Sequence, residues 1–351
     1  YSETLQFSEQ QGNYILIAEV AGGALASILA MFWINKVNWR LVIVFALSCV
    51  VIGNIITTML TDPNMITALR FCVGFLGQGT AFAVGISMVG NTNDPDRNFG
   101  FVITAQVAFG VIALLTLPML AKHYQSISGM YVPLAVIAAL GLLIIKFIPT
   151  GSAHHEAAGG EQPTGSYGLP ITALVAMFVW CCGLGAMWGF LAEIGIKGGV
   201  EQLLAYRALS ISSAIAITGS LAAAAFAARG VNRFMPVTIA LLVQIIMAWF
   251  LQGQMDWVEM VIKASIFQIF WNMTGPFFMG AIAASDTGGK ISVLIPAAQT
   301  SGFFIGPYIV GKFMESTGTG LEAVSYITIA FCALSLVIFV PLSARLKAAG
   351  Y

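Results

Sequence analysis

Five ionisable side chains lie inside long apolar stretches of the sequence. They are Glu19, Arg70, Glu193, Arg207 and Lys263. An ionised group in the middle of a membrane costs at least about 2.5 to 3.5 kcal/mol, so each of them is a candidate for chemistry or for an ion pair. A carboxyl group in such a place can bind and release a proton, and a guanidinium can hold an anion.

Glu19 and Arg70 are the best matched of these residues. Counting about 1.5 Å of rise per helical residue, both lie roughly 9 to 12 Å below the same membrane surface, so they could pair. Either Glu19 binds protons with Arg70 as its charge partner or substrate anchor, or the two form a purely structural salt bridge. Glu193 and Arg207 flank one loop at a shallower depth and could form a second pair. The ammonium group of Lys263 can extend to the interface.

A second candidate surface consists of amide and indole side chains. Gln268, Trp271, Asn272 and Gly275 follow the spacing i, i+3, i+4, i+7 and therefore share one helix face. Because an amide facing lipid would be expensive, we expect this face in the protein interior. There it either lines a substrate cavity or bonds to a neighbouring helix, and the sequence leaves both open. Weaker candidates of the same type are Trp180, Trp188, Gln78, Gln106 and Gln299.

Residue types that usually hold metals or cofactors have no suitable spacing. The five cysteines lie within apolar stretches, and we expect them to be small buried hydrophobic side chains. His154 and His155 lie in a glycine-rich segment and His123 near a helix end, which is typical of solvated residues. Zinc-ligand spacing, a Ser/His/Asp arrangement and a phosphate-binding glycine loop are all missing from the sequence. We therefore expect no metal site, no cofactor and no enzymatic activity.

The composition places the chain in a lipid bilayer. Of its 351 residues, 58% are hydrophobic and 9% are charged, whereas soluble proteins carry about 25% charged residues. This excludes a disordered chain and a water-soluble domain. The formal net charge of +0, from 15 basic and 15 acidic residues, argues against a nucleic-acid partner.

Eleven stretches are long enough to cross the hydrocarbon core as helices. That core is about 30 Å thick, and a helix is the single-segment geometry that satisfies its own backbone without water. We expect spans at residues 11–34, 39–61, 64–91, 98–121, 130–149, 170–195, 203–228, 233–252, 257–284, 290–312 and 322–343.

The loops between these spans predict the topology, because basic residues stay preferentially in the cytoplasm. Lys and Arg concentrate on the side that holds the C-terminus and the polar segment 150–169, which is rich in Gly, Ser and Thr and is typical of a flexible linker. Tyr1 then lies outside, with five spans before the linker and six after it. We expect one further span ahead of Tyr1, giving six plus six with both ends cytoplasmic.

The pattern RFCVGFLGQGTA at 70–81 belongs to a helix with one nearly bare face. Arg70, Gly74, Gly77, Ala81 and Gly85 follow i, i+4, i+7, i+11, i+15, so they line up on an α-helix. Small residues let helices approach closely in lipid.

Five further segments, together with 70–81, carry a resemblance to a known family. They are FSEQQG at 7–12, SILAMFWINKVNWR at 27–40, DPDRNFG at 94–100, ARGVNR at 228–233 and the glycines around Pro307. In order and spacing, and over the whole chain, they resemble the major facilitator superfamily (MFS). Segment 27–40 stands where that family has its signature loop, with Asn35 and Lys36 in place of the usual Asp-Arg. Segment 228–233 keeps the basic residues of the equivalent loop and lacks the acid.

The resemblance implies an all-α, polytopic membrane protein with two six-helix bundles. Its domains would be residues 1–149, the linker 150–169 and residues 170–351. Members of the family move small molecules by rocking two bundles about a central site. We therefore expect a monomeric secondary active transporter of the plasma (inner) membrane, coupled to protons, for a small organic solute that is anionic or aromatic.

The expected roles follow from these positions. Coupling or gating is assigned to Glu19, Arg70, Glu193 and Arg207. Substrate contact is assigned to Arg70, Gln78, Trp180, Trp188, Gln268, Trp271, Asn272 and Gln299.

Alternatives remain at this stage. The degraded loop signatures are also compatible with a transport-inactive scaffold or assembly factor of the same fold. Segment 106–118, QVAFGVIALLTLP, lacks the Gly-Pro pair of drug-exporting relatives, which favours import or symport. A channel is disfavoured, since the sequence has no repeated ring of charge.

Overall fold

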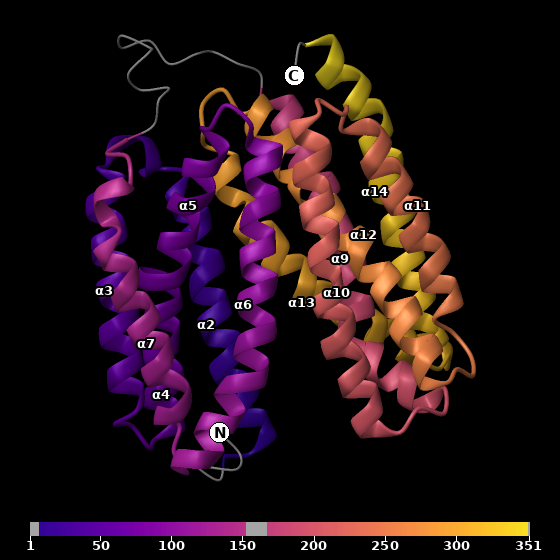
Figure 1. Cartoon of the computed structure of the whole chain (residues 1–351), viewed down its shortest axis with the longest axis horizontal. Helices are drawn as coiled ribbons and strands as arrows, with labels where there is room; N and C mark the ends of the chain where they lie inside the picture. Colours follow the sequence, from indigo (N-terminus) through magenta and orange to yellow (C-terminus); the bar gives the residue numbers. More distant parts are fainter. Residues whose placement is uncertain (1–6, 152–166, 350–351) are drawn as a thin grey trace. The chain divides into compact units, whose positions relative to one another are not determined.

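The computed structural model describes residues 7–151 and 167–349, and within these ranges the chain consists of helices joined by turns and loops (Figure 1). Residues 152–166, which include His154, His155 and most of the expected linker, lie outside the described residues, as do residues 1–6.

Each of the eleven expected spans coincides with a helix or a continuous helical run. The long elements are α2 (Glu9–Ala30), α3 (Trp39–Thr57), α4 (Pro63–Cys72), the π-helical η2 (Val73–Gly79), α5 (Thr80–Gly90), α6 (Pro95–Tyr124), α7 (Ser128–Leu143), α9 (Gly168–Lys197), α10 (Gln202–Ala228), α11 (Phe234–Phe250), α12 (Trp257–Ser285), α13 (Ile295–Thr317) and α14 (Glu322–Ala348). Three 3-10 turns, η1 (Ile34–Lys36), η3 (Ile145–Phe147) and η4 (Ser292–Leu294), lie between them.

Length and composition make most of these helices suited to a bilayer. Among the described residues, 8 helical segments are long and apolar enough to cross a membrane, and α7 and α11 are shorter apolar helices. The 29-residue α12 carries Glu259 and Lys263 in its first turns.

Local capping explains where several helices begin. Ser8 and Gln11 form a capping box at the start of α2, with a bond of 2.9 Å from the Ser8 backbone N–H to the Gln11 side chain. Asp62 caps α4 through a 2.8 Å bond from the Met65 N–H, just before Pro63 at the first helical position. These caps satisfy N–H groups that a helix start leaves without internal partners.

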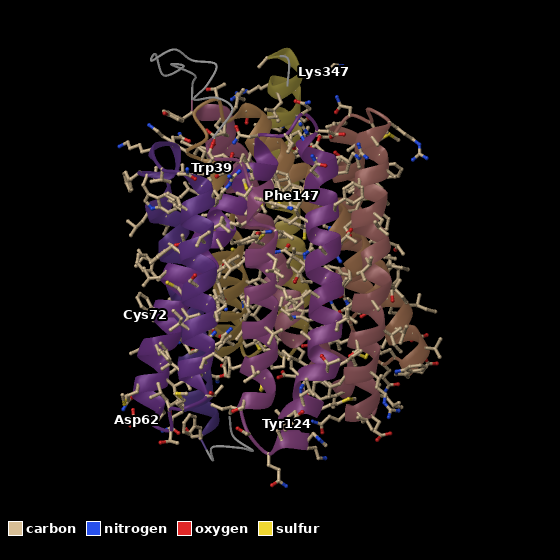
Figure 2. All side chains as sticks on the ribbon, turned by 60° about the vertical axis from the view of Figure 1, so that its left-hand side comes forward. Trp39, Asp62, Cys72, Tyr124, Phe147 and Lys347 are labelled. Atoms are coloured by element: carbon tan, nitrogen blue, oxygen red, sulfur yellow. The ribbon has the colours of Figure 1, made fainter. Side chains whose placement is uncertain are left out.

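The expectation for the cysteines is wrong at Cys72. Cys181, Cys182 and Cys332 are buried, but Cys49 is half-buried and Cys72 is exposed. Figure 2 shows Cys72 on the outer side of the helices that surround it. A helix in lipid is apolar on all sides, so an apolar sequence neighbourhood does not separate a lipid-facing position from a packed one.

The described residues cluster into two compact units. Unit 1 comprises residues 1–91, 112–165 and 287–297. In it, α2 packs against α4 and η2, α3 packs against α7 and η2, and the η4 turn packs against α2 and α5. A buried cluster that includes Ile34, Trp39, Ile43, Val84 and Val293 joins η1, α3, α5 and η4.

Unit 2 comprises residues 92–111, 166–286 and 298–351. Here α10 packs along α12, α9 packs along α14, and α11 contacts both α12 and α14. Its aromatic core includes Trp180, Phe278 and Phe339, with the Trp180 and Phe278 ring centroids 5.4 Å apart. The long helix α6 is divided, so that residues up to 111 belong to unit 2 and the remainder to unit 1.

The helical run that carries Arg70 differs from the expected straight α-helix. The π-helical segment Val73–Gly79 inserts an extra residue into the turn and rotates everything beyond it. As a result, the small residues do not share one face. A Cβ at Gly74 would overlap the Glu19 carbonyl of α2, and one at Gly77 would lie 2.7 Å from Val50 of α3, whereas Gly85 faces open space.

Candidate functional site

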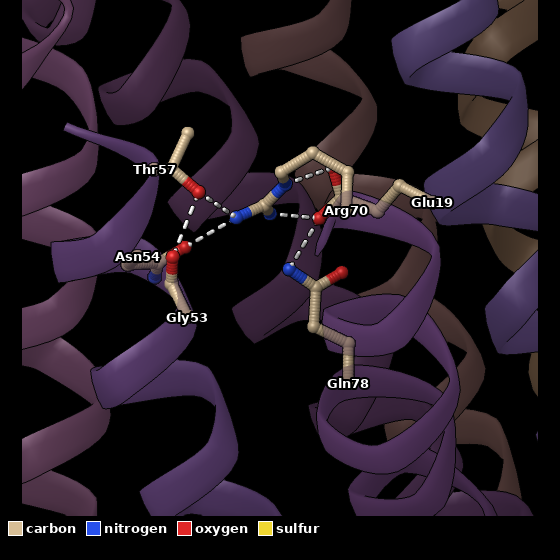
Figure 3. A network of polar contacts seen from close by, with 6 residues as sticks. All are labelled: Glu19, Gly53, Asn54, Thr57, Arg70 and Gln78. Carbon is tan, nitrogen blue, oxygen red and sulfur yellow. Dashed lines mark hydrogen bonds and ion pairs between the residues drawn. The ribbon is translucent and has the colours of Figure 1, made fainter. Parts of the chain in front are cut away.

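Glu19 and Arg70 form an ion pair within unit 1 (Figure 3). The contact is bidentate: Arg70 Nη2 donates to Glu19 Oε1, and Arg70 Nε donates to Glu19 Oε2 at 3.0 Å. Arg70 is 1% exposed and the side chain of Glu19 is 17% exposed. The expected pairing of α2 with α4 is therefore confirmed, and the carboxylate retains an accessible side.

Three further side chains contact the Arg70 guanidinium. Arg70 Nη1 donates to Asn54 Oδ1 at 2.7 Å and lies 3.4 Å from Thr57 Oγ1. The Tyr131 ring of α7 lies 4.8 Å from the Arg70 Cζ atom, at the distance of a cation–π contact. Side chains from α2, α3 and α7 therefore contact the Arg70 guanidinium together.

Gln78 adds a contact on the carboxylate side. Its Nε2 donates to Glu19 Oε1 at 2.8 Å, although the side chain is exposed. Gln78 lies in the π-helical segment, and π segments occur frequently at functional sites because they re-aim side chains. Gly74 makes the geometry possible, since it lets the α2 backbone at Glu19 approach without a Cβ in the way.

The electrostatics of this network make its parts interdependent. A buried guanidinium without an anion is strongly unfavourable, and so is a carboxylate that loses its donors. The Asn54 Nδ2 group, buried beside the guanidinium, has no hydrogen-bond partner among the described residues.

Sequence reasoning missed Asn54, Thr57 and Tyr131. Asn54 and Thr57 stand three residues apart in an otherwise apolar helix, a spacing that could have indicated a shared polar face. Tyr131 carried no such signal, because a Tyr near a helix end is ordinary at a membrane interface.

The second predicted pair does not form. Glu193 and Arg207 are both exposed, and within the described parts of the chain no hydrogen bond or ion pair joins them. Lys263 bonds instead to Glu259 at 3.3 Å, one helical turn earlier in α12. An i,i+4 pair of this kind is exposed and structural in character.

The amides of α12 bond to the neighbouring helix α10. Gln268 Nε2 donates to Ser212 Oγ at 2.6 Å, and Ser213 Oγ donates to Gln268 Oε1 at 3.0 Å. Asn272 Nδ2 donates to the Ala216 carbonyl at 3.3 Å. Of the two readings that the sequence left open for this face, the helix-to-helix contact is the one present in unit 2.

Trp180 is a packed side chain rather than a cavity wall. It is 1% exposed, and its Nε1 donates to Gln244 Oε1 at 2.9 Å. Gln244 in turn donates to Thr274 at 3.3 Å. Gln244 was not anticipated, although a single amide in the apolar run of α11 was a visible signal.

Trp188 and Trp271 belong to an aromatic cluster contributed by three helices. Their ring centroids are 5.8 Å apart at an interplanar angle of 76°, and the Trp271 centroid lies 5.4 Å from that of Phe303. All three side chains are half-buried, so each keeps part of its ring available for contact. Gln299 is likewise half-buried, and Gln106 is exposed.

Ligands for a metal do not gather in the described residues. Across 7–151 and 167–349, no group of three or more His, Cys, Asp or Glu side chains lies close enough to hold an ion.

Comparison with known proteins identifies the fold. The chain matches a crystal structure of the MFS transporter FucP, described in the outward conformation, with a TM-score of 0.76 at 13% identity, over 95% of this chain and 90% of that one. A second structure, of the E. coli fucose:proton symporter FucP, gives 0.73 at 15% identity, over 95% and 91% of the two chains. The proton:xylose symporter XylE gives 0.71 at 12% identity, over 95% and 87%.

The chain has the MFS fold. It is an integral, multi-pass, all-α membrane protein. No protein-family model matches the sequence, and no curated protein matches it either.

Two loop segments that carry the MFS resemblance make specific contacts. Asn35, where the family usually has Asp, donates from Nδ2 to the Gly288 carbonyl at 2.7 Å within unit 1. The partner is a carbonyl oxygen, so this bond needs a donor, which the Asn35 amide has and an ionised Asp lacks. The loop therefore keeps a specific contact without the acid.

The second contact lies in unit 2. Arg233 of the segment ARGVNR donates from Nε to both Asp96 oxygens, at 3.0 and 2.8 Å, and Asp96 belongs to the segment DPDRNFG. Asp96 rests against Gly280 of α12, where a Cβ would overlap its carboxylate. This ion pair of unit 2 was not anticipated from the sequence.

Proposed function

We propose that this chain is a secondary active transporter that moves a small organic solute by alternating access and couples that movement to protons at Glu19. The observation that carries the proposal is the Glu19–Arg70 network, a carboxylate held by a buried guanidinium in the MFS fold. Two of the similar structures are described as proton symporters, which supports the coupling.

The contacts of the carboxylate support the proposed proton coupling. Ionised Glu19 accepts hydrogen bonds from Arg70 and Gln78, and protonation weakens all of them. The guanidinium then needs another acceptor, because it is buried. A solute that supplies one binds better to the protonated protein, and this difference in affinity links proton and solute.

The solute class is inferred from the groups that would meet it. Arg70 and the unpartnered amide N–H of Asn54 favour a molecule rich in acceptors, such as a polyol or an anion. Within unit 2 taken by itself, the half-buried rings of Trp188, Trp271 and Phe303 favour contact with an aromatic solute. Fucose and xylose, which the similar symporters are described as carrying, are rich in acceptors and are the first candidates.

The moving parts would be the bundles 1–149 and 170–351, working as a monomer in the plasma (inner) membrane. The distribution of Lys and Arg supports a cytoplasmic C-terminus and linker. Rocking these bundles would have to break the contacts of α6 with α10 and those of segment 287–297 with α2 and α5. Gating by Glu193 and Arg207 stays a prediction.

The test is transport in proteoliposomes loaded with a pH-sensitive dye. Under an inwardly directed proton gradient, fucose, xylose and an aromatic carboxylate such as benzoate are added one at a time. We expect one class to enter above the level of protein-free vesicles and to bring protons with it.

The decisive variant is Glu19→Gln, which keeps the shape and removes the titrating group. We expect it to lose accumulation driven by the pH gradient while solute exchange at equal pH persists. Glu259→Gln is the matched control, because Glu259 also pairs with a cation but is 52% exposed. Proton-coupled accumulation that survives Glu19→Gln would remove Glu19 from the mechanism. A folded protein that transports none of the panel would favour the alternative, a transport-inactive scaffold.

A further inference from the structure

A small cavity lies at one end of unit 2, remote in sequence from the Glu19 network. Its volume is about 180 Å³, and its walls come from the end of α9, the loop after α11 and the start of α14. Because α14 spans the membrane and ends near the C-terminus, this cavity opens on the membrane side opposite the C-terminus. It could hold several water molecules or one small solute.

Glycines shape the wall of the cavity. The Met255 N–H donates to the Gly198 carbonyl at 2.9 Å and ties the loop after α11 to the end of α9. Gly199 and Gly253 adopt φ angles of +108° and +83°, which side chains with a Cβ rarely tolerate. A Cβ at Gly198 would lie 2.8 Å from the Gly253 carbonyl. The backbone of this wall therefore has a specific turn conformation that depends on glycine.

Two polar atoms in this wall are buried without a partner. Ser325 is 0% exposed, and its Oγ has no hydrogen-bond partner among the described residues. The Nε2 of Gln252 is buried in the same way. Both residues line the cavity, both groups can donate, and buried donors are rarely left unsatisfied, so this part of the wall is suited to an acceptor group.

Two opposite charges stand at the mouth of the cavity and do not bond to each other. Glu322 Oε2 and Lys197 Nζ lie 2.7 and 2.9 Å from the position that a Cβ on Gly320 would take, so both face the same point. Neither side chain has an ion-pair partner in the described ranges. Glu322 lies in the first turn of α14 and Lys197 in the last turn of α9, where the helix dipoles favour their charges.

We propose that this cavity binds a small zwitterion of the free amino acid class. The carboxylate of such a molecule accepts from Ser325, Gln252 and Lys197, and its ammonium group donates to Glu322. Ile194, Leu251 and Leu321 supply the apolar surface for a small side chain. The arrangement uses both orphaned donors and both unpaired charges, which neither a simple anion nor a simple cation does.

Binding is tested on the purified full chain in detergent, by thermal unfolding with three isosteric probes. These are L-alanine, propionate, which keeps only the carboxylate, and n-propylammonium, which keeps only the cation. We expect L-alanine to raise the unfolding temperature at millimolar concentration, and the two single-charge probes to raise it much less.

Two variants and a control locate the site. Lys197→Met and Glu322→Gln change exposed side chains, so the fold is kept, and each should weaken the apparent affinity for L-alanine roughly tenfold. Lys312→Met removes another exposed cation of unit 2, which pairs with Glu315, and should leave the affinity unchanged.

Three results would overturn the proposal. They are no stabilisation by L-alanine, equal stabilisation by propionate, and binding that survives both variants. The readout is binding in detergent, so it is independent of transport activity, and failure of the proposed transport function would leave it unaffected.

Discussion

Arg70 is the residue on which the polar network of unit 1 depends. It is 1% exposed and contacts Glu19, Asn54 and Tyr131 from three different helices. Removing Glu19 or Asn54 would leave N–H groups of the buried Arg70 guanidinium without an acceptor. The proposed proton coupling rests on this property, because Glu19 and Asn54 share the same guanidinium.

A double-mutant cycle tests this dependence. Arg70→Gln leaves the partly buried Glu19 carboxylate without its cation, and we expect a loss of roughly 1 to 3 kcal/mol in unfolding free energy. Adding Glu19→Gln removes the orphaned charge, so the double variant should be more stable than Arg70→Gln alone. Thermal unfolding in detergent measures both. Lys312→Met, which breaks an exposed pair, should change stability by less than about 0.5 kcal/mol. Simple additivity of the two substitutions would argue against a coupled pair.

At the scale of elements, the helical run from 63 to 90 positions the site through its irregularity. The π-helical segment aims Gln78 at Glu19 and turns Gly74 toward α2 and Gly77 toward α3. Gly79 was not part of the face of small residues expected for an α-helix, yet it lies against Gly23 of α2. The helices thus approach one another through glycines on several faces, and packing is what determines the register.

Alanine substitution distinguishes these glycines. In Gly74→Ala the new methyl group overlaps the Glu19 carbonyl, so α2 must shift, and we expect a loss of about 1 to 3 kcal/mol together with reduced transport. Gly85→Ala, in the same helical run, meets nothing within 4 Å and should be neutral, or more stable by up to about 1 kcal/mol. Thermal unfolding of both variants gives the comparison. Equal stability of the two would show that α2 does not depend on close approach at Gly74.

At the scale of the molecule, α6 is the element that any rocking motion must disturb. Its first part is fitted to unit 2, since a Cβ at Gly100 would lie 2.9 Å from Ala224 and Thr104 Oγ1 lies 2.7 Å from Ser220 Oγ. Arg233 and Asp96 secure its start. If the bundles 1–149 and 170–351 alternate in access as proposed above, these contacts must open and re-form.

A reversible crosslink tests that requirement. The oxygens of Thr104 and Ser220 are close enough for cysteines at both positions to form a disulfide. We expect oxidation of the Thr104→Cys, Ser220→Cys variant to stop proteoliposome transport and reduction to restore it. The Thr104→Cys single variant, treated identically, should keep its activity. Transport that continues with the crosslink formed would mean that α6 and α10 stay together throughout the cycle.

The sequence by itself determined the membrane-spanning segments and the charged residues that must avoid lipid, because exposing charge or backbone to lipid is costly. Because of that cost, the eleven spans could be predicted as helices, and Glu19 with Arg70 and Glu193 with Arg207 could be named as possible pairs of charges at matching depth. The first pair forms. The resemblance of several segments to the MFS predicted the fold, and the structural comparison confirmed it.

Only the tertiary structure decided which apolar helix faces touch protein and which touch lipid, because both are equally hydrophobic. For that reason Cys72 is exposed, Gln268 bonds to α10, and Glu193 stays apart from Arg207. The contacts of Arg70 with Asn54 and Tyr131, and of Asp96 with Arg233, join residues far apart in the chain. Their geometry depends on how whole helices pack, which no local spacing specifies.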